Sequence, residues 1–321
     1  MKKLIGFLKE WMLPCAIVLG IGLYLVYHFV PVLHPWGPVL HVAASEGQRL
    51  VIAVLLFFQF VKISPHDLKL SRWHLGALAV QVLSFLLLAG LVALTRGELR
   101  MLLECAMLCM ICPTASAAGV ITDRLGGDLA ATVTYLVLIN VAGTFLIPLI
   151  IPLVNPSSTL GFWAYVGHIA LKVFPVLILP GLLAWLVRYT THRLQRRLMR
   201  WASNSFYVWG IGLTLAMVLS TRALLLSSLG VWAVAGIVLV SVLCCFVQFF
   251  TGRWMGRAKV ESLTAGQALG QKNTGFLIWL GYNYLTPVTS VAGGLYAIWQ
   301  NLFNSWELYR KAHEDAQQKA A

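Results

Sequence analysis

Ten apolar segments constrain this chain more than any other feature, because each is near the roughly 20 residues that a helix needs to cross a bilayer. Of the 321 residues, 59% are apolar and 11% are charged, and the mean hydropathy is +0.80, which excludes a soluble globular protein. We therefore predict an all-α, multi-pass membrane protein. The segments run approximately over 11–31, 47–63, 74–94, 99–122, 129–154, 161–187, 201–221, 226–250, 261–283 and 286–306.

The basic residues indicate topology. A formal net charge of +13 would suggest a nucleic-acid partner for a soluble chain. With the N-terminus and its Lys2, Lys3 and Lys9 placed inside, 18 of the 24 lysines and arginines fall in inner loops or at the inner ends of segments, and Lys172 and Lys272 lie in the interior of segments. The four on the outer side are Arg49, Arg96, Arg100 and Arg222. This bias predicts a bacterial inner (plasma) membrane location with both termini cytoplasmic, membrane lipid as the surroundings and no nucleic-acid partner.

Two segments contain helix breakers at matching places. Pro113 interrupts the fourth segment, and Gly270 and Gly275 flank a polar cluster around Lys272 in the ninth. The two breaks are 159 positions apart, almost half the chain, and each belongs to the fourth segment of a five-segment half. Because each half has an odd number of segments, the second half has the opposite orientation in the membrane to the first. We predict ten transmembrane helices in two inverted five-helix repeats, whose broken helices meet at the midplane as in many secondary transporters.

Several stretches occur in the order typical of one transporter family. They are "FVKISPHDLKL" (60–70), "AVQVLSF" (79–85), "CPTASAAGVITDRLGGDLA" (112–130), "KVFPVLILPGLLA" (172–184), "GQKNTGF" (270–276) and "LYAIWQNLFNS" (295–305). On these residues the chain resembles the bile acid:sodium symporter family. The resemblance implies crossing fourth and ninth helices, and uptake of bile acids or small carboxylates together with two sodium ions. It also implies a panel domain (1–63 and 161–221), a core domain (74–154 and 226–306) and a cytoplasmic tail (307–321).

The departures from the family pattern concern the sodium sites. Ala118 and Gly119 stand where the family usually has a serine and an asparagine, and Ala268 stands where it has a glutamate. A hard cation needs several oxygen ligands, usually with a carboxylate among them, so bound sodium is doubtful here and no other cofactor is expected. The residues that correspond to the ion sites are Gln81, Ala118, Gly119, Thr132, Ala268, Gln271 and Lys272.

Lys272 gives the leading hypothesis about mechanism. One ammonium without a carboxylate carries the same net charge as the family's single carboxylate with two sodium ions. We hypothesise that the Lys272 ammonium replaces the cation and donates hydrogen bonds to Gln81, to the Gln271 side chain or to backbone carbonyls freed by the break. Burial disfavours the charged form of a lysine, so proton-coupled exchange is permitted.

Other interpretations of Lys272 remain open from sequence. Its side chain could reach toward the interface, although a stem of about 6 Å is short for this depth. It could form an ion pair with Glu46, Glu104 or Asp123 if folding brings one of them close. It could also contact an anionic substrate directly.

The same breaks predict where a substrate binds. Backbone amides at the start of a half-helix favour an anion, so Thr114 and Ser116 after Pro113 are candidate substrate-binding residues. Asn273 and Thr274 approach from the facing break. A small organic anion is therefore the expected substrate.

Other function classes find little support. Cys105, Cys109 and Cys112 share one helical face, a spacing that could bind a soft metal and that helix packing explains equally well. No H-E-x-x-H motif is present, and we expect no enzyme. The leading prediction is a secondary active transporter of an organic anion with sodium coupling lost or altered. The alternatives are a sodium-coupled symporter with non-standard ligands and a non-transporting membrane sensor; the sequence indicates no oligomeric state.

Overall fold

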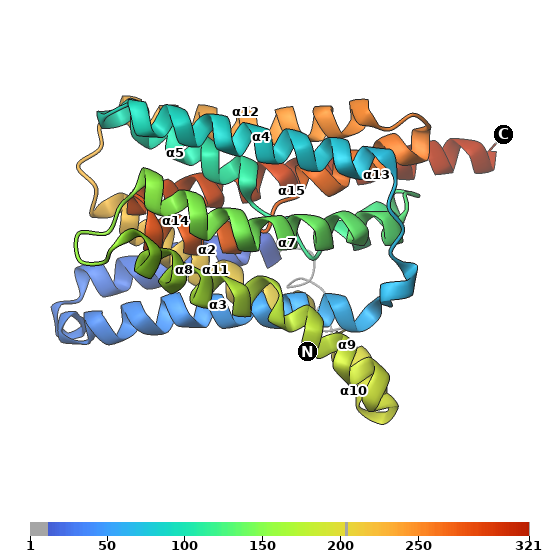
Figure 1. The fold of residues 1–321 in the computed structure, drawn as a ribbon, viewed down its shortest axis with the longest axis horizontal. Coiled ribbons are helices and arrows are strands. Elements are labelled where there is room, and N and C mark those ends of the chain that lie inside the picture. The colour runs from blue at the N-terminus through green and yellow to red at the C-terminus, as the bar shows by residue number, and fades with distance from the viewer. Residues whose placement is uncertain (1–11, 203–204, 321) are drawn as a thin grey trace.

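The computed structural model describes residues 12–202 and 205–320, and α-helices dominate that part of the chain (Figure 1). The prediction of an all-α protein is confirmed, while Lys2, Lys3 and Lys9 lie outside the described residues. The α-helices are α2 (Met12–Phe29), α3 (Gly37–Lys62), α4 (Arg72–Leu94), α5 (Gly97–Ile111), α6 (Ala118–Arg124), α7 (Leu129–Val154), α8 (Phe162–Leu177), α9 (Leu179–Thr190), α10 (His192–Ala202), α11 (Ser205–Leu225), α12 (Val231–Met255), α13 (Lys259–Gly270), α14 (Thr274–Tyr284) and α15 (Ser290–Ala320). Three short 3-10 helices are η1 (Pro31–Trp36), η2 (Pro65–Asp67) and η3 (Pro287–Thr289).

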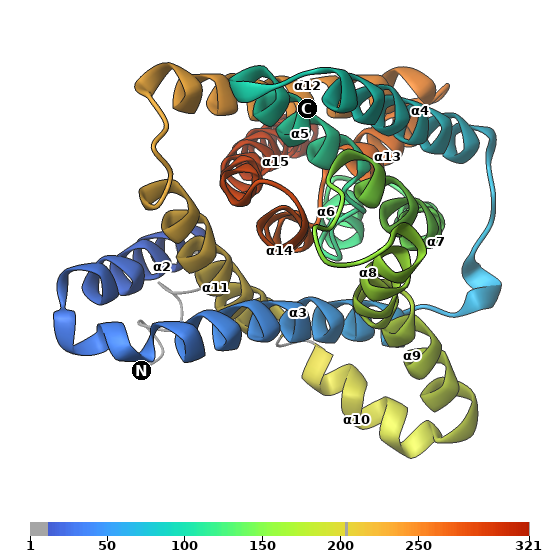
Figure 2. The same cartoon turned by 60° about the vertical axis from the view of Figure 1, so that its left-hand side comes forward.

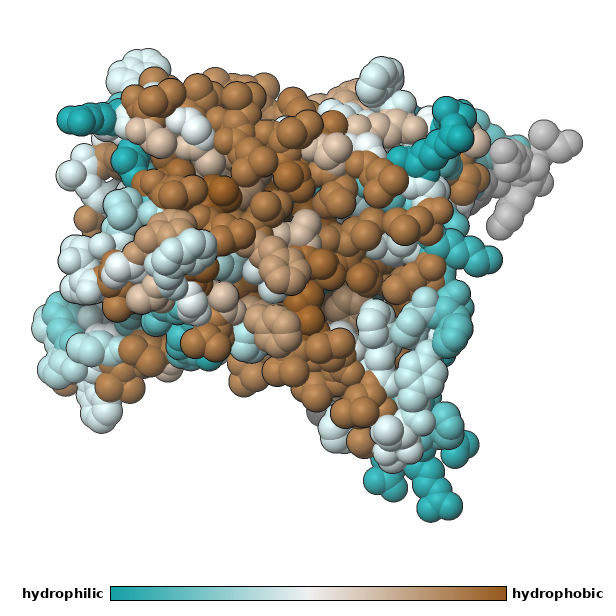
Figure 3. Space-filling model, in the orientation of Figure 1, coloured by the Kyte–Doolittle hydropathy of each residue, from teal (hydrophilic) through white to brown (hydrophobic). Residues whose placement is uncertain are grey.

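The helix lengths and the surface both suit a bilayer. Among the described residues, five helices are long and apolar enough to cross a membrane, and the bent pair α8 and α9 makes a sixth candidate. Hydrophobic residues cover the middle of the surface in Figure 3, and hydrophilic residues gather at its two ends along the helix direction. The chain is therefore a multi-pass membrane protein.

Each predicted segment contains a helix or a pair of helices, but several boundaries differ. The second helix, α3, begins at Gly37 rather than at residue 47. Its first turns carry Glu46 and Arg49, which lower the hydropathy but form an ion pair of 2.5 Å within the helix. The stretch predicted as an inner loop between segments six and seven forms the amphipathic helix α10. At the C-terminal end, α15 continues without interruption through the predicted boundary between 306 and 307.

A third break, which the sequence analysis did not identify, divides the sixth segment. Helices α8 and α9 meet at Ile178 with a bend of 40°. Pro180 lies in the first turn of α9 and has no backbone N–H to continue the hydrogen bonding of α8. The bend directs α9 away from the bundle and toward α10 (Figure 2).

The helices form two groups with the broken pairs between them. Figure 2 shows α4 and α12 along one side of the molecule, and α2, α11 and α3 along the other, with α5, α6, α13 and α14 between them. Helix α5 packs against α4 and α12, and α13 packs against the same two helices. Helix α14 lies between α15, α11 and α3. The two breaks are thereby held inside the protein.

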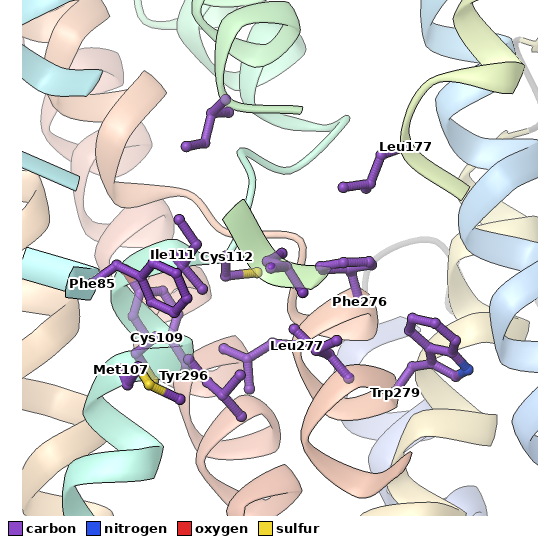
Figure 4. Packing of buried hydrophobic residues seen from close by; sticks show 14 of the residues in the cluster. Phe85, Met107, Cys109, Ile111, Cys112, Leu177, Phe276, Leu277, Trp279 and Tyr296 are labelled. Carbon is purple, nitrogen blue, oxygen red and sulfur yellow. The ribbon is translucent and has the colours of Figure 1, made fainter. Parts of the chain in front are cut away.

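A large apolar cluster surrounds the breaks. Figure 4 shows Cys112 at the end of α5 near Phe85 of α4 and Phe276 of α14, with Tyr296 of α15 close by. All four side chains are buried. In a bilayer, where lipid is as apolar as these side chains, close van der Waals packing holds the breaks in position.

Candidate functional site

The two breaks cross as a short antiparallel bridge between Thr114 and Lys272. The backbone N–H of Ala115 donates to the carbonyl of Gln271 at 3.0 Å, and that of Asn273 donates to the carbonyl of Pro113 at 2.8 Å. Two broken helices that approach in opposite directions can pair their extended segments in this way without leaving backbone groups unsatisfied. The predicted breaks are therefore present and in contact.

The helix that follows each break begins differently. Helix α14 begins directly at Thr274, and the Asn273 side chain caps it by accepting a hydrogen bond of 3.2 Å from the backbone N–H of Phe276. Helix α6 begins only at Ala118 and has seven residues. The expectation that a half-helix starts at Thr114 is wrong, because Thr114 belongs to the extended bridge and its backbone faces the other break.

Protein donors already occupy the carbonyl oxygens that the breaks release. Gln81 Nε2 donates to the carbonyl of Cys112 at 2.8 Å, and Thr114 Oγ1 donates to that of Ala268 at 2.6 Å. The Tyr296 hydroxyl donates to the carbonyl of Gly270 at 2.8 Å. These carbonyls are the oxygens that could serve a bound cation when a carboxylate is missing. Their engagement weakens the case for sodium at this crossing.

Lys272 lies in the centre of the crossing with 0% of its surface exposed. Gln300 of α15 holds its backbone on both sides: Lys272 N donates to Gln300 Oε1 at 2.8 Å, and Gln300 Nε2 donates to the Lys272 carbonyl at 3.2 Å. The ammonium nitrogen Nζ has no hydrogen-bond partner among the described residues. The backbone is thus fixed, while the charged end of the side chain is left without a protein acceptor.

The charged groups around Lys272 are unusual. The titratable side chains that surround it in the described part of the chain are uncharged thiols, with no carboxylate among them. They are Cys109, Cys112, Cys244 and Cys245. An ammonium in apolar surroundings without an opposite charge is energetically costly, which is typical of functional groups in membranes.

The hydrogen bonds expected for Lys272 are not formed. Gln81 uses its amide nitrogen for Cys112 and its oxygen for the Tyr135 hydroxyl, at 2.7 Å. The Gln271 side chain instead donates to Gln267, which in turn donates to Glu307. Both glutamine side chains therefore bind other groups of the protein. The predicted hydrogen bonds from the Lys272 ammonium to Gln81 and to Gln271 are wrong.

Two of the other interpretations of Lys272 also fail. Complete burial excludes a side chain that reaches the interface. Glu104 binds Arg100 at 3.1 Å, and Glu46 lies at 2.5 Å from Arg49 and 3.8 Å from Lys172. Since Lys272 Nζ has no acceptor within the described chain, Asp123 is not its partner either.

The remaining ion-site equivalents offer few oxygens. Ala118 and Ala268 are both fully buried, and neither has a side-chain oxygen. Gly119 also lacks a side-chain oxygen and lies beside Leu129 of α7 and the amide nitrogen of Gln59. Thr132 is buried, but its hydroxyl donates to the carbonyl of Asp128 at 2.9 Å along its own helix. These residues do not fit the oxygen-rich shell that sodium requires.

The predicted substrate-binding residues lie around the same crossing. Thr114 is fully buried, with its hydroxyl bound to Ala268. Ser116 is half-buried in the turn before α6. Asn273 and Thr274 form the start of α14, where the backbone amides of an 11-residue helix converge. Of the two helix starts that follow the breaks, that of α14 has the longer helix and a side-chain cap.

Sequence reasoning missed three amide residues near the crossing. Gln300 is described above. Gln48 of α3 is 1% exposed, its Oε1 has no partner in the described chain, and its Nε2 would lie 2.6 Å from a Cβ added at Gly275. Asn140 of α7 is also 1% exposed, with both polar side-chain atoms unpartnered among described residues. Unsatisfied buried amides are rare and often mark ligand positions.

A metal centre finds no support in the described residues, because no group of three or more histidine, cysteine or acidic side chains is arranged to hold an ion. Cys109 lies on α5 and Cys244 on α12, and these two helices pack together. Apolar packing accounts for the cysteine spacing seen in the sequence.

The fold and the crossed breaks define the class of protein: a polytopic membrane protein built around two discontinuous helices, as in secondary transporters. The sequence profile of the SBF-like CPA transporter family matches residues 12–289, which cover most of the chain and both breaks. The chain belongs to this family of membrane transporters, and the resemblance to bile acid:sodium symporters is confirmed at this level. The comparison with curated proteins gave no match.

Proposed function

We propose that the protein is a secondary active transporter of a small organic anion, with ten spans in two inverted five-helix repeats. The helix contacts support the repeat. Helix α4 packs on α5 and α7 as α12 packs on α13 and α15. Helix α7 contacts α13 as α15 contacts α5, and α3 contacts α9 as α11 contacts α2. Each of these contacts therefore has a counterpart five spans away.

The proposal includes a panel domain (1–63 and 161–221), a core domain (74–154 and 226–306) and a cytoplasmic tail (307–321). A plasma-membrane location with both termini inside follows from the distribution of basic residues. Helices α5, α6, α13 and α14 belong to the core, so both breaks would move together when the domains shift. Movement of the core past α3 would expose the crossing to one side of the membrane at a time.

The observation that carries the mechanism is the Lys272 ammonium, fully buried at the crossing and without an acceptor in the described chain. We propose that it supplies the positive charge that sodium supplies in related symporters. The occupied carbonyls and the alanines at 118 and 268 leave few ligands for an alkali ion. Transport would therefore be independent of sodium.

The proposed substrate carries a carboxylate, as a bile acid or a smaller acid does. Its negative group would bind at the start of α14, near Asn273, Thr274 and the Gln48 amide from α3. Thr114 and Ser116 border this site from the other break. The Lys272 charge lies one residue before the Asn273 cap and would favour an anion there.

The test is counterflow in proteoliposomes. Vesicles that contain the purified protein and an unlabelled carboxylate should take up the labelled carboxylate at the same rate in sodium, potassium or choline buffer. A collapse of uptake without sodium would show that Lys272 does not replace the cation, and would favour a sodium-coupled symporter with other ligands. An anion that raises the unfolding temperature without any counterflow would instead indicate a sensor.

A further inference from the structure

Helix α10 forms an arm outside the main bundle. It follows α9 after the bend at Ile178 and contacts only α3 and α9 to a substantial extent within the described chain. Figure 2 shows the arm on the far side of α3, away from the other helices. Neither the crossing nor the proposed substrate site uses it.

One face of α10 is strongly basic. Successive residues of a helix are rotated by about 100°, which places all four arginines of α10 within an arc of about 100°. The four are exposed and line one shallow hollow: Arg193, Arg196, Arg197 and Arg200. The helix sequence, HRLQRRLMRWA, contains no acidic residue, so no acid of the same helix neutralises this face.

The opposite face of α10 is apolar. Leu198 packs against the main hydrophobic cluster, whereas Leu194 is 42% exposed and Trp201 is 66% exposed. Figure 3 shows hydrophilic residues at the end of the arm and hydrophobic surface between them and the body of the protein. A short helix with arginines on one face and leucine and tryptophan on the other is suited to the boundary between headgroups and acyl chains.

We propose that the arginine face of α10 binds the phosphate groups of anionic phospholipids in the inner leaflet. Guanidinium groups bind phosphate oxygens through paired, charge-assisted hydrogen bonds, and four of them share one hollow. Trp201 and Leu194 contact the acyl chains beside the same lipid. The lipid thereby holds the arm of α9 and α10 at the membrane surface next to α3.

The test compares two triple variants of the full-length protein in mixed micelles. Arg193→Gln, Arg196→Gln and Arg197→Gln together remove three charges from the hollow. The control, Lys69→Gln, Arg72→Gln and Lys259→Gln, removes three charges from exposed residues elsewhere on the predicted inner side. Phosphatidylglycerol binding is measured by native mass spectrometry and by the shift in unfolding temperature, with phosphatidylcholine and inorganic phosphate as comparison ligands.

The wild type and the control should prefer phosphatidylglycerol over phosphatidylcholine, and the α10 variant should bind it about a hundredfold more weakly, since each juxtamembrane arginine contributes about fivefold. Equal binding by the α10 variant would overturn the proposal, as would an equal loss in the control. Stabilisation by inorganic phosphate as large as that by lipid would also overturn it, because the ligand would then be a soluble anion. Should the triple variant not fold, Arg196→Gln alone should weaken binding about fivefold, and an unchanged affinity would refute the assignment.

Discussion

Replacement of Lys272 by methionine tests whether the lysine charge serves transport or stabilises the fold. Methionine has a similar length but no charge, and the Gln300 contacts to residue 272 involve only backbone atoms, so they persist in the variant. The wild-type ammonium is fully buried and has no acceptor in the described chain. We therefore expect Lys272→Met to stabilise the protein and to impair transport.

The size of both effects follows from burial. Replacement of buried ionic groups by apolar side chains stabilises proteins by about 1–4 kcal/mol, and Lys272 has no partner whose loss would offset this gain. The unfolding temperature should rise by several degrees. A charge about 8 Å from a bound anion contributes about 2 kcal/mol at an effective dielectric constant of about 20, so anion affinity should fall about 30-fold.

The assay is thermal unfolding of the purified variant together with counterflow in proteoliposomes. Lys69→Met serves as the control, because Lys69 is exposed outside the described helices and its loss should change neither stability nor transport. Two results would refute the reasoning. A less stable Lys272→Met variant would mean that the ammonium has a structural partner, and unchanged counterflow would mean that its charge has no role in transport.

Three further predictions concern the same crossing. Lys272→Gln combined with Ala268→Glu should introduce stabilisation by sodium of about 1 kcal/mol when sodium is several-fold above its Kd, and thermal shifts in sodium against choline will reveal it. Gly275→Ala should displace the Gln48 amide and reduce anion affinity in binding assays. Little stability should be lost, because the added Cβ clashes only with the end of the flexible Gln48 side chain. The control Gly90→Ala, whose Cβ meets no atom within 4 Å, should leave anion affinity unchanged. Gln300→Leu should lower the free energy of unfolding by about 1–3 kcal/mol in chemical denaturation, since it leaves the buried Lys272 N–H without an acceptor, whereas Asn301→Ala removes only a bond within α15 and should cost less.

The positions of the breaks could be predicted because they depend on local backbone chemistry. Pro113 removes a donor in one segment, and two glycines flank polar residues in the other. The burial of Lys272 followed from its distance to the ends of its segment. The lack of an acceptor for its ammonium could not be predicted, because the Tyr135 hydroxyl that binds the Gln81 oxygen comes from another helix.

The role of α3 was missed for a different reason. His41 and Ser45 were left outside the predicted segment 47–63, although His41, Ser45, Gln48 and Ile52 are spaced by four, three and four positions. This spacing predicts one helical face. Ser45 of that face donates to Asn283 of α14 at 3.2 Å, and Gln48 faces Gly275. Attention to periodicity, rather than hydropathy alone, would have extended α3 and identified Gln48.

A fixed ammonium differs from a bound sodium ion in one decisive respect, because it cannot leave with the substrate. A symporter that releases sodium on the low-concentration side gains the free energy of the sodium gradient in each cycle, whereas Lys272 returns with the protein. If the lysine remains charged throughout, the anion can move only down its own gradient or in exchange for another anion. Net uphill transport would require Lys272 to lose its proton on one side of the membrane and regain it on the other. No acceptor within the described chain stabilises the ammonium, and an unpaired charge in apolar surroundings is costly to keep. On the proposed mechanism, exchange without a sodium gradient and a response to a proton gradient would both follow from the same buried charge.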